Sequence, residues 1–412
     1  MQHFIKDLQY YKFSLYGFFK NLRFFEPFLI LYFLDKGMSY TQIGILYAVR
    51  EVGINILEIP TGIMADIIGR KRTMLMAFSS YIVSFAVFYL FSGFWFFILA
   101  MVSFAFGESF RGGTHKAMIF TYLKLNGWEN QKVAYYGHTR SWSQMGSALS
   151  SLLAAAIVLI SGNYQAVFLL SILPYIADFI LIATYPKELD GEIQNNTDSV
   201  SSKLREVWAS IKMAFRQVTL FRLFGNLALY GGLFKASKDY LQPILVMAVL
   251  AISLAPGVSP ENKSTVAIGI IYFIIYSITA VTTRNSGKIT AWIGTLGRTI
   301  NITLVLGAFI SIAVGLLVKN QIPVVAAILF LFLYVIENLR KPVGISAVAD
   351  TLTPNILATG LSSQSLLESI ASALFAFLLG ILADNAGLGV AFITAGIIVL
   401  LIFPWIRVKA QK

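Results

Sequence analysis

The chain has 412 residues, of which 57% are hydrophobic and 13% are charged, and its formal net charge is +12. A soluble globular protein carries about 25% charged residues, so the composition excludes that class. The apolar residues form continuous runs that do not alternate, which excludes a β-barrel and predicts an all-α polytopic membrane protein. The chain contains no cysteine, so disulfides and thiolate metal sites are excluded as well.

Twelve apolar runs are long enough to cross a bilayer as helices, because a spanning helix needs about 20 residues. In chain order, the expected spans cover residues 11–34, 39–64, 73–92, 94–122, 134–161, 164–185, 219–250, 264–282, 299–318, 321–350, 358–383 and 386–407. Lysine and arginine concentrate in alternate connecting segments, which the positive-inside rule makes cytoplasmic. We therefore expect a multi-pass protein of the cell (inner) membrane with both termini in the cytoplasm. The positive-inside rule accounts for the positive net charge, so we expect no nucleic-acid partner.

The one long polar stretch, residues 186–217, divides the spans into six and six. Its first part is rich in Asn, Asp and Ser, which is typical of a linker. Its second part has apolar and basic residues at helical spacing, which indicates an amphipathic helix on the cytoplasmic membrane surface. The predicted organisation is an N-terminal six-helix bundle at 1–185, this linker, and a C-terminal six-helix bundle at 218–412.

The two halves carry the same features in the same order. The first and seventh spans each place two cations three residues apart and then a proline, and the fourth and tenth spans each place an acid three residues before an arginine. The matching residues are Lys20, Arg23 and Pro27 against Lys235, Lys238 and Pro243, and Glu108 and Arg111 against Glu337 and Arg340. These matches predict two pseudo-symmetric bundles, a plan known from a large class of transporters.

The loop after the second span reads GIMADIIGRKR over residues 62–72. It resembles the signature loop of the major facilitator superfamily, Gly-x-x-x-Asp-x-x-Gly-Arg-[Arg/Lys]-x, and every key position is met. The resemblance implies twelve helices in two bundles that transport by alternating access. It also implies a conformational role, away from the substrate, for four residues that stabilise the outward-open state. These residues are Gly62, Asp66, Gly69 and Arg70.

Charged side chains lie inside several expected spans, where each costs about 2.5–3.5 kcal/mol at a helix centre and so must face a partner or a water-filled cavity. Cations outnumber acids there, which favours a cavity that attracts anions. Arg and Lys are also the residues that hold phosphate and carboxylate groups. The substrate-binding candidates are Lys20, Arg23, Arg111, Arg140, Lys235, Lys238 and Arg340. The alternative is structural ion pairing, which the i, i+3 spacing favours for the Glu108–Arg111 and Glu337–Arg340 pairs.

Several carboxylates in the same spans are candidates for proton coupling, because a carboxyl group in a low-dielectric cavity can take up and release a proton. These are Glu26, Glu51, Glu58, Glu108, Asp178, Glu337 and Glu368. The sequence has no nucleotide-binding loop, so we expect an ion or substrate gradient to supply the energy for transport.

We therefore expect a secondary active transporter that moves a small organic anion by proton symport or anion exchange. The alternative is proton-coupled efflux of lipophilic compounds, although the fifth span lacks the proline of the motif that drug/proton antiporters usually carry. A third hypothesis is a transporter-like receptor or scaffold without flux. We expect no enzymatic activity, cofactor or metal, and a monomer whose partners are a small-molecule substrate and the lipid bilayer.

Overall fold

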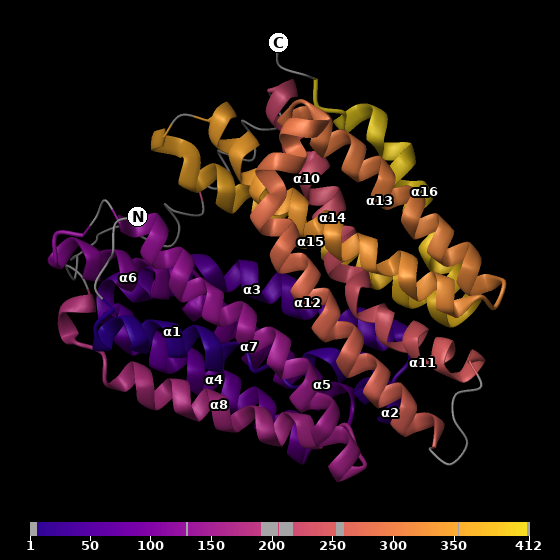
Figure 1. The fold of residues 1–412 in the computed structure, drawn as a ribbon, viewed down its shortest axis with the longest axis horizontal. Coiled ribbons are helices and arrows are strands. Elements are labelled where there is room, and N and C mark those ends of the chain that lie inside the picture. The colour runs from indigo at the N-terminus through magenta and orange to yellow at the C-terminus, as the bar shows by residue number, and fades with distance from the viewer. Residues whose placement is uncertain are drawn as a thin grey trace. The chain divides into compact units, whose positions relative to one another are not determined.

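The computed structural model describes residues 6–128, 131–190, 205, 217–252, 259–352 and 354–409. Within these ranges the chain forms helices and no β-strand, which confirms the all-α class (Figure 1). Nine helical segments of the described part have the length and apolar character of a membrane span. Most of the predicted linker, including its amphipathic helix, lies outside the described residues.

The helices form two compact units. The first contains the described residues of Met1–Phe28 and Gly53–Val200, and the second contains those of Leu29–Val52 and Ser201–Lys412. The sequence predicted an N-terminal bundle at 1–185, but residues 29–52 belong to the second unit because they pack against its helices, including α11 and α15. Helix α3, Tyr40–Ile68, therefore starts in the second unit and ends in the first.

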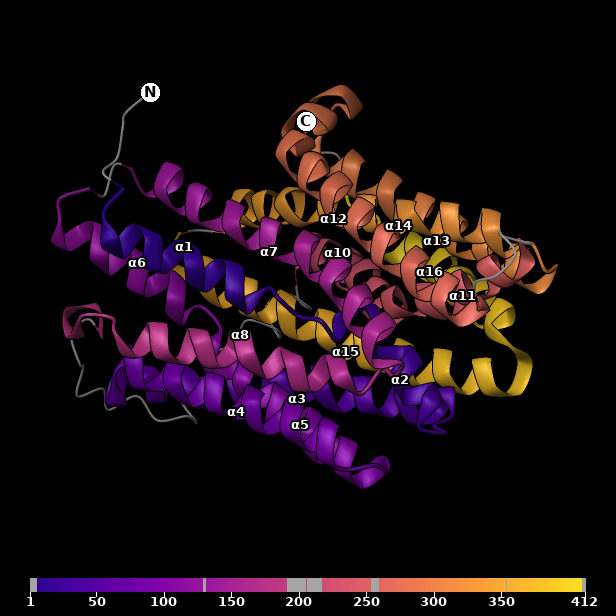
Figure 2. The ribbon, with the colours of Figure 1, turned by 60° about the horizontal axis from the view of Figure 1, so that its bottom comes forward.

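In the first unit, α4 packs against both α5 and α8, and α1 packs against α7 and α8 (Figure 2). Its helical elements besides the second half of α3 are α1 (Leu8–Lys20), η1 (Glu26–Phe28), α4 (Arg70–Leu90), α5 (Phe94–Arg111), α6 (Thr114–Leu125), α7 (Lys132–Ser161), α8 (Ala166–Ala183) and η3 (Lys187–Asp190).

In the second unit, α10 packs along α15, and α13 packs between α14 and α16. Its helical elements besides the first half of α3 are α2 (Leu29–Asp35), α10 (Val218–Ser237), η4 (Lys238–Tyr240), α11 (Leu241–Ala251), α12 (Pro260–Ile293), α13 (Leu296–Lys319), α14 (Pro323–Thr351), α15 (Pro354–Ala386) and α16 (Leu388–Ile406).

Three of the predicted spans are interrupted. α1 ends at Lys20, where the side chain of Asn21 donates a hydrogen bond of 2.7 Å to the Gly17 carbonyl. α5 ends at Arg111, and α6 starts after Gly113, whose φ of 74° breaks the helix. α10 ends at Ser237 and continues through the η4 turn into α11. Interrupted helices place polar side chains and helix ends inside a span, as at the substrate sites of many secondary transporters.

Glycines bring α15 close to two other helices of the second unit. A Cβ atom on Gly44 would lie 2.3 Å from the carbonyl oxygen of Ala376, so α3 and α15 meet with their backbones nearly in contact. A Cβ atom on Gly231 would lie 2.6 Å from the Cδ of Glu368. The absence of a side chain at Gly231 therefore lets a carboxylate from α15 lie directly against α10.

Candidate functional site

A polar cavity of about 340 Å³ lies within the first unit, among α1, α6, α7 and the end of α5. Four cations line it: Lys20 of α1, Arg111 of α5, Lys116 of α6 and Arg140 of α7. The described lining contains no Asp or Glu. We call this site the basic cavity. It brings together three of the predicted substrate-binding cations, Lys20, Arg111 and Arg140.

Uncharged polar and aromatic groups complete the lining of the basic cavity. The ring of Tyr16 stacks on that of His115 with centroids 3.6 Å apart, and His115 Nε2 lies 3.2 Å from the hydroxyl of Tyr185. Ser143 and Gln144 of α7 also face the cavity. These groups can donate hydrogen bonds to a bound molecule in addition to the charges.

Arg23 and Arg111 share one carboxylate. Arg23 binds one oxygen of Glu108 and Arg111 binds the other, and Arg111 Nε also donates to the hydroxyl of Tyr81 at 3.3 Å. The predicted Glu108–Arg111 pair is therefore present, with a second arginine added from another part of the chain. Glu108 by itself balances one of the two guanidinium charges, and Glu26 also acts electrostatically on Arg23.

Lys20 has a different environment from the two arginines. Its ammonium group makes no ion pair or hydrogen bond within the described residues, whereas its carbonyl accepts a hydrogen bond from Tyr175 at 3.1 Å. Lys20 also acts electrostatically on Asp178. The side chain of Asp178 is 0% exposed, and neither of its oxygens has a hydrogen-bond partner in the described chain. Lys20, which lines the basic cavity, therefore acts on a buried carboxyl group that has no hydrogen-bond partner in the described chain.

In the second unit, Lys235 lies between two carboxylates. Its Nζ is 2.9 Å from Glu368 Oε1 and 3.7 Å from Glu51 Oε2. Glu51 also pairs with Arg50 at 3.1 Å, and Gln364 donates to the other oxygen of Glu368 at 2.9 Å. This network joins α3, α10 and α15 and is balanced in charge, with two cations and two acids.

Lys238 of η4 and Glu337 of α14 are paired as well. Lys238 lies 3.1 Å from the buried carboxylate of Asp239, and its carbonyl accepts a hydrogen bond from Tyr334 at 2.8 Å. Glu337 pairs with Lys341 at 3.5 Å, and the Lys341 side chain is 62% exposed. The cationic pair that the sequence repeats in both halves is therefore neutralised in the second unit and only partly neutralised in the first.

Arg340 was predicted to bind substrate, but the structure surrounds it with protein groups. It is 3% exposed and donates to Ile300 O, to Thr303 Oγ1 and to both oxygens of Asn226. Its guanidinium also lies 4.7 Å from the ring centre of Tyr230. These contacts join α10, α13 and α14, so we leave Arg340 out of the proposed site.

Two predicted proton-coupling carboxylates lie outside the lining of the basic cavity, although Glu26 acts electrostatically on Lys20 and Arg23. Glu26 is half-buried in the η1 turn, and Glu58 is exposed on α3. Neither lines the basic cavity.

The signature loop is held by contacts within the first unit. Gly69 has a φ of 93° and precedes α4, and a Cβ there would lie 3.0 Å from the Asp190 carboxylate. Arg70 donates to Thr121 Oγ1 at 2.7 Å. A Cβ on Gly62 would meet nothing within 4 Å. The side chain of Asp66 lies outside the described part of the chain. The loop thus joins α4 to α6 and η3.

The start of α3 is held by an acid that the sequence reasoning missed. Asp384, near the end of α15, accepts hydrogen bonds from the backbone N–H of Tyr40 at 2.8 Å and of Thr41 at 2.7 Å. These amides are donors that the first turn of a helix leaves free. Gln242 similarly accepts from the backbone N–H of Ile30 at 2.9 Å. A lone acid at the end of an apolar run gives no sequence signal of such a cap.

Lys116 is the other functional candidate that the sequence reasoning left aside. It follows the Gly112–Gly113 break and lies 5.5 Å and 5.6 Å from the ring centres of Phe120 and Tyr136. The glycine pair was the available signal, because a helix break beside Arg111 changes the direction of the residues that follow.

Comparison with known proteins gives a match over most of the chain. A sequence model of the Major Facilitator Superfamily matches residues 15–339. The uncharacterised transporter YxaM of this type, from Bacillus subtilis (strain 168), is 27% identical over 238 residues. That match covers 54% of each protein, so the chain spans about half the length of this relative.

Solved structures show the same fold. The chain is similar to the nucleoside transporter NupG with a TM-score of 0.77 and 12% identity, over 98% of this chain and 100% of that one. It is also similar to a POT family transporter in complex with 5-aminolevulinic acid, with a TM-score of 0.74 and 15% identity, over 96% and 94% of the two chains. At these identities the likeness concerns the fold alone.

Proposed function

The chain belongs to the Major Facilitator Superfamily and is an integral multi-pass membrane transporter, and from this premise we propose that it moves a small organic anion by alternating access. The observation that supports an anion is the basic cavity, whose described lining has four cations and no carboxylate. Its volume of about 340 Å³ lies near the lower end of the range of about 300–1,000 Å³ for small-molecule sites. This size suits a small metabolite.

Lys20 and Arg140 are the cations that we assign first to the substrate. Neither forms an ion pair within the described chain, so a bound carboxylate or phosphate would supply their counter-charge. Grouped charges in a cleft with low-dielectric walls attract ions of opposite sign. Arg140 can bind such a group through two parallel hydrogen bonds, and Lys20 acts as a point charge.

We assign Arg111 a second contact with the substrate. Glu108 binds both Arg111 and Arg23, and Glu26 also acts electrostatically on Arg23, so Arg23 keeps a counter-charge when Arg111 binds a substrate. An anion in the basic cavity would reach Arg111, which lines it, while Glu108 stays bound to Arg23. Arg23 then positions Glu108 and does not contact the substrate.

We further propose that the network of Lys235, Glu51 and Glu368 couples transport to protons. Protonation of Glu368 would remove one of the two negative charges that hold Lys235. The lysine would then be free to move or to bind an anion. This mechanism corresponds to proton symport; anion exchange would leave the network ionised throughout the cycle.

Location and assembly follow from the same family membership and from the charge distribution. We place the protein in the cell membrane with both termini cytoplasmic, because Lys and Arg concentrate in the segments that this orientation puts inside. We propose that it works as a monomer, since the basic cavity is formed within one unit of a single chain.

Uptake into proteoliposomes tests the proposal with a panel of anionic metabolites, nucleosides, peptides and lipophilic dyes. Losing one charged contact costs about 1.5–3 kcal/mol, so we expect Lys20→Ala and Arg140→Ala to raise the KM for the transported anion about 10- to 100-fold. Lys124→Ala is the matched control, because this exposed lysine of α6 does not line the basic cavity. Wild-type KM values in both cavity variants would refute the anion site.

The same panel separates the alternatives. Transport of dyes, and resistance that Glu368→Gln abolishes, would identify a proton-coupled exporter of lipophilic compounds. Absence of flux for every compound, together with a stable protein partner, would identify a receptor or scaffold.

A further inference from the structure

A second basic pocket lies within the second unit, far along the chain from the basic cavity. It has a volume of about 410 Å³ and is formed by α10, α13 and the residues that follow α16. Four cations line it: Arg222, Arg298, Arg407 and Lys409. The described lining includes no acid. We call this site the tail pocket.

The cations of the tail pocket have no ion-pair partner among the residues that the structure describes. None of the four forms an ion pair with a described carboxylate, and the Nε of Arg222 is buried without a hydrogen-bond partner in that part of the chain. Asp350 lines an adjoining cavity together with Lys409. Four cations against this one described acid leave the tail pocket strongly positive. An anion from outside the protein would therefore be bound favourably.

The tail pocket is also held in place by hydrogen bonds. Asn301 of α13 donates to the carbonyl of Val408 at 2.7 Å and accepts from the Val408 N–H at 3.0 Å. Asn226 of α10 donates to Asn301 at 3.2 Å and accepts from the buried Arg340. These hydrogen bonds hold the backbone of Val408 and so position its two neighbours, Arg407 and Lys409, at the tail pocket.

Exposed apolar side chains place the tail pocket at the edge of the membrane. α16 exposes Leu401 and Trp405, and α13 exposes Ile302 and Leu306. Trp405 is 66% exposed and lies two residues before Arg407, and tryptophan is enriched where lipid headgroups begin. Basic pockets between membrane helices at this level are typical of sites for anionic headgroups.

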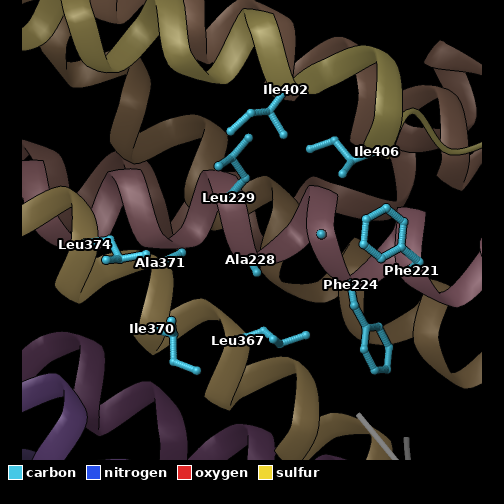
Figure 3. Close-up of a pocket in the computed structure, with 11 residues that line it drawn as sticks. Phe221, Phe224, Ala228, Leu229, Leu367, Ile370, Ala371, Leu374, Ile402 and Ile406 are labelled. Carbon is cyan, nitrogen blue, oxygen red and sulfur yellow. The ribbon is translucent and has the colours of Figure 1, made fainter. Parts of the chain in front are cut away.

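An apolar groove lies next to the tail pocket, on α10 and α16, which also line that pocket. It has a volume of about 220 Å³, and side chains of α10, α15 and α16 line it (Figure 3). Its lining includes Phe221, next to Arg222, and Ile406, next to Arg407. Neighbouring residues of α10 and α16 therefore line a basic pocket and an apolar groove, as a lipid with a charged head and an acyl tail requires.

We propose that the tail pocket binds the phosphate of an anionic phospholipid, with an acyl chain of that lipid in the groove shown in Figure 3. Arg222, Arg298, Arg407 and Lys409 supply the charge for the phosphate. The bound lipid holds the end of α16 against α10 and α13. This site is separate from the basic cavity and does not depend on which substrate is carried.

Native mass spectrometry and thermal unfolding test the site on the full-length protein. The probes are phosphatidylglycerol, phosphatidylcholine and inorganic phosphate, each added to protein in a neutral detergent. We expect phosphatidylglycerol to form a retained one-to-one adduct and to raise the melting temperature. Phosphatidylcholine, which has no net charge, and inorganic phosphate, which has no acyl chain, should do neither.

Two double variants test whether the four cations of the tail pocket bind the lipid. Arg222→Gln with Arg298→Gln removes the cations on the helices, and Arg407→Gln with Lys409→Gln removes those after the last helix, where folding of the helices is least affected. Each pair should weaken phosphatidylglycerol binding about 30-fold, from the usual strength of basic residues near anionic lipid. Arg284→Gln with Lys288→Gln is the control, because these two exposed cations of α12 lie outside the pocket.

Two results would overturn the proposal. The first is that the Arg407/Lys409 variant keeps the lipid adduct and its thermal stabilisation at the wild-type level. The second is that inorganic phosphate stabilises the protein as strongly as phosphatidylglycerol does, in which case the pocket binds a free anion and the groove plays no part.

Discussion

Replacing Arg340 with lysine distinguishes a structural residue from a substrate-binding one. The guanidinium donates through Nη1 to Ile300 O at 2.5 Å and Thr303 Oγ1 at 2.7 Å, and through Nη2 to the carbonyl and side-chain oxygens of Asn226 at 3.0 Å and 2.8 Å. A lysine ammonium is a single point and serves only one of these two pairs of acceptors. Two hydrogen bonds from a charged donor are lost, each worth about 1.5 kcal/mol at the lower limit. We therefore expect Arg340→Lys to lower the free energy of unfolding by about 3 kcal/mol.

Unfolding in detergent, with and without a saturating anion, measures this change. The anion should stabilise Arg340→Lys by as much as it stabilises the wild type, because the substrate contacts lie elsewhere. The control is Lys288→Ala, because this lysine of α12 is exposed and surface substitutions usually change the free energy of unfolding by about 0.5 kcal/mol or less. The structural assignment is refuted if Arg340→Lys unfolds within 1 kcal/mol of the wild type and has lost the stabilisation by the anion.

Three further changes examine the second unit. Glu368→Gln should abolish accumulation driven by a pH gradient in proteoliposomes and leave counterflow exchange intact; gradient-driven accumulation in this variant would contradict proton coupling at this residue. Asp384→Asn should weaken the cap on the first turn of α3 by about 0.5–2 kcal/mol and separate the start of α3 from α15 more often. This would be seen as faster maleimide labelling of one cysteine engineered at that contact, in a chain that has none; an unchanged labelling rate would argue against a stabilising cap. Gly231→Ala should destabilise the protein by about 1–3 kcal/mol by overpacking, because its Cβ would lie 2.6 Å from the Cδ of Glu368. In contrast, Gly287→Ala, where a Cβ meets nothing within 4 Å, should raise the free energy of unfolding by up to about 1 kcal/mol; equal melting temperatures for the two variants would contradict the close packing.

Hydropathy alone could not predict where the helices are interrupted within the spans. The run from residue 18 to 34 is apolar enough for one helix, but the side chain of Asn21 bonds to the Gly17 carbonyl and α1 ends at Lys20. A polar residue that caps its own helix lowers the hydropathy of a window only slightly. At Gly113 the break was easier to anticipate, because two adjacent glycines inside a helix are unfavourable.

Spacing along the sequence predicted one of two ion pairs within a helix correctly, and it could not predict ion pairs between helices. The i, i+3 rule found Glu108 with Arg111, which the structure contains. It gave no indication that Arg23 binds the same carboxylate, because the packing of helices decides which residues distant in sequence come within 4 Å. The same rule suggested Glu337 with Arg340, but Glu337 pairs with Lys341, and Arg340 turns to α10 and α13.

The sequence by itself determined the membrane class, the superfamily and the repetition of a cationic pair in both halves, because apolar runs, charge bias and motif spacing are properties of neighbouring residues. Only the tertiary structure decided that the two pairs differ. Glu51 and Glu368 reach Lys235 from α3 and α15 and neutralise it, whereas no described carboxylate forms an ion pair with Lys20, which faces a cavity with three other cations. The balance of charge in a site depends on which helices pack together, and that is why the repeated pair is a neutral network in one unit and a candidate anion site in the other.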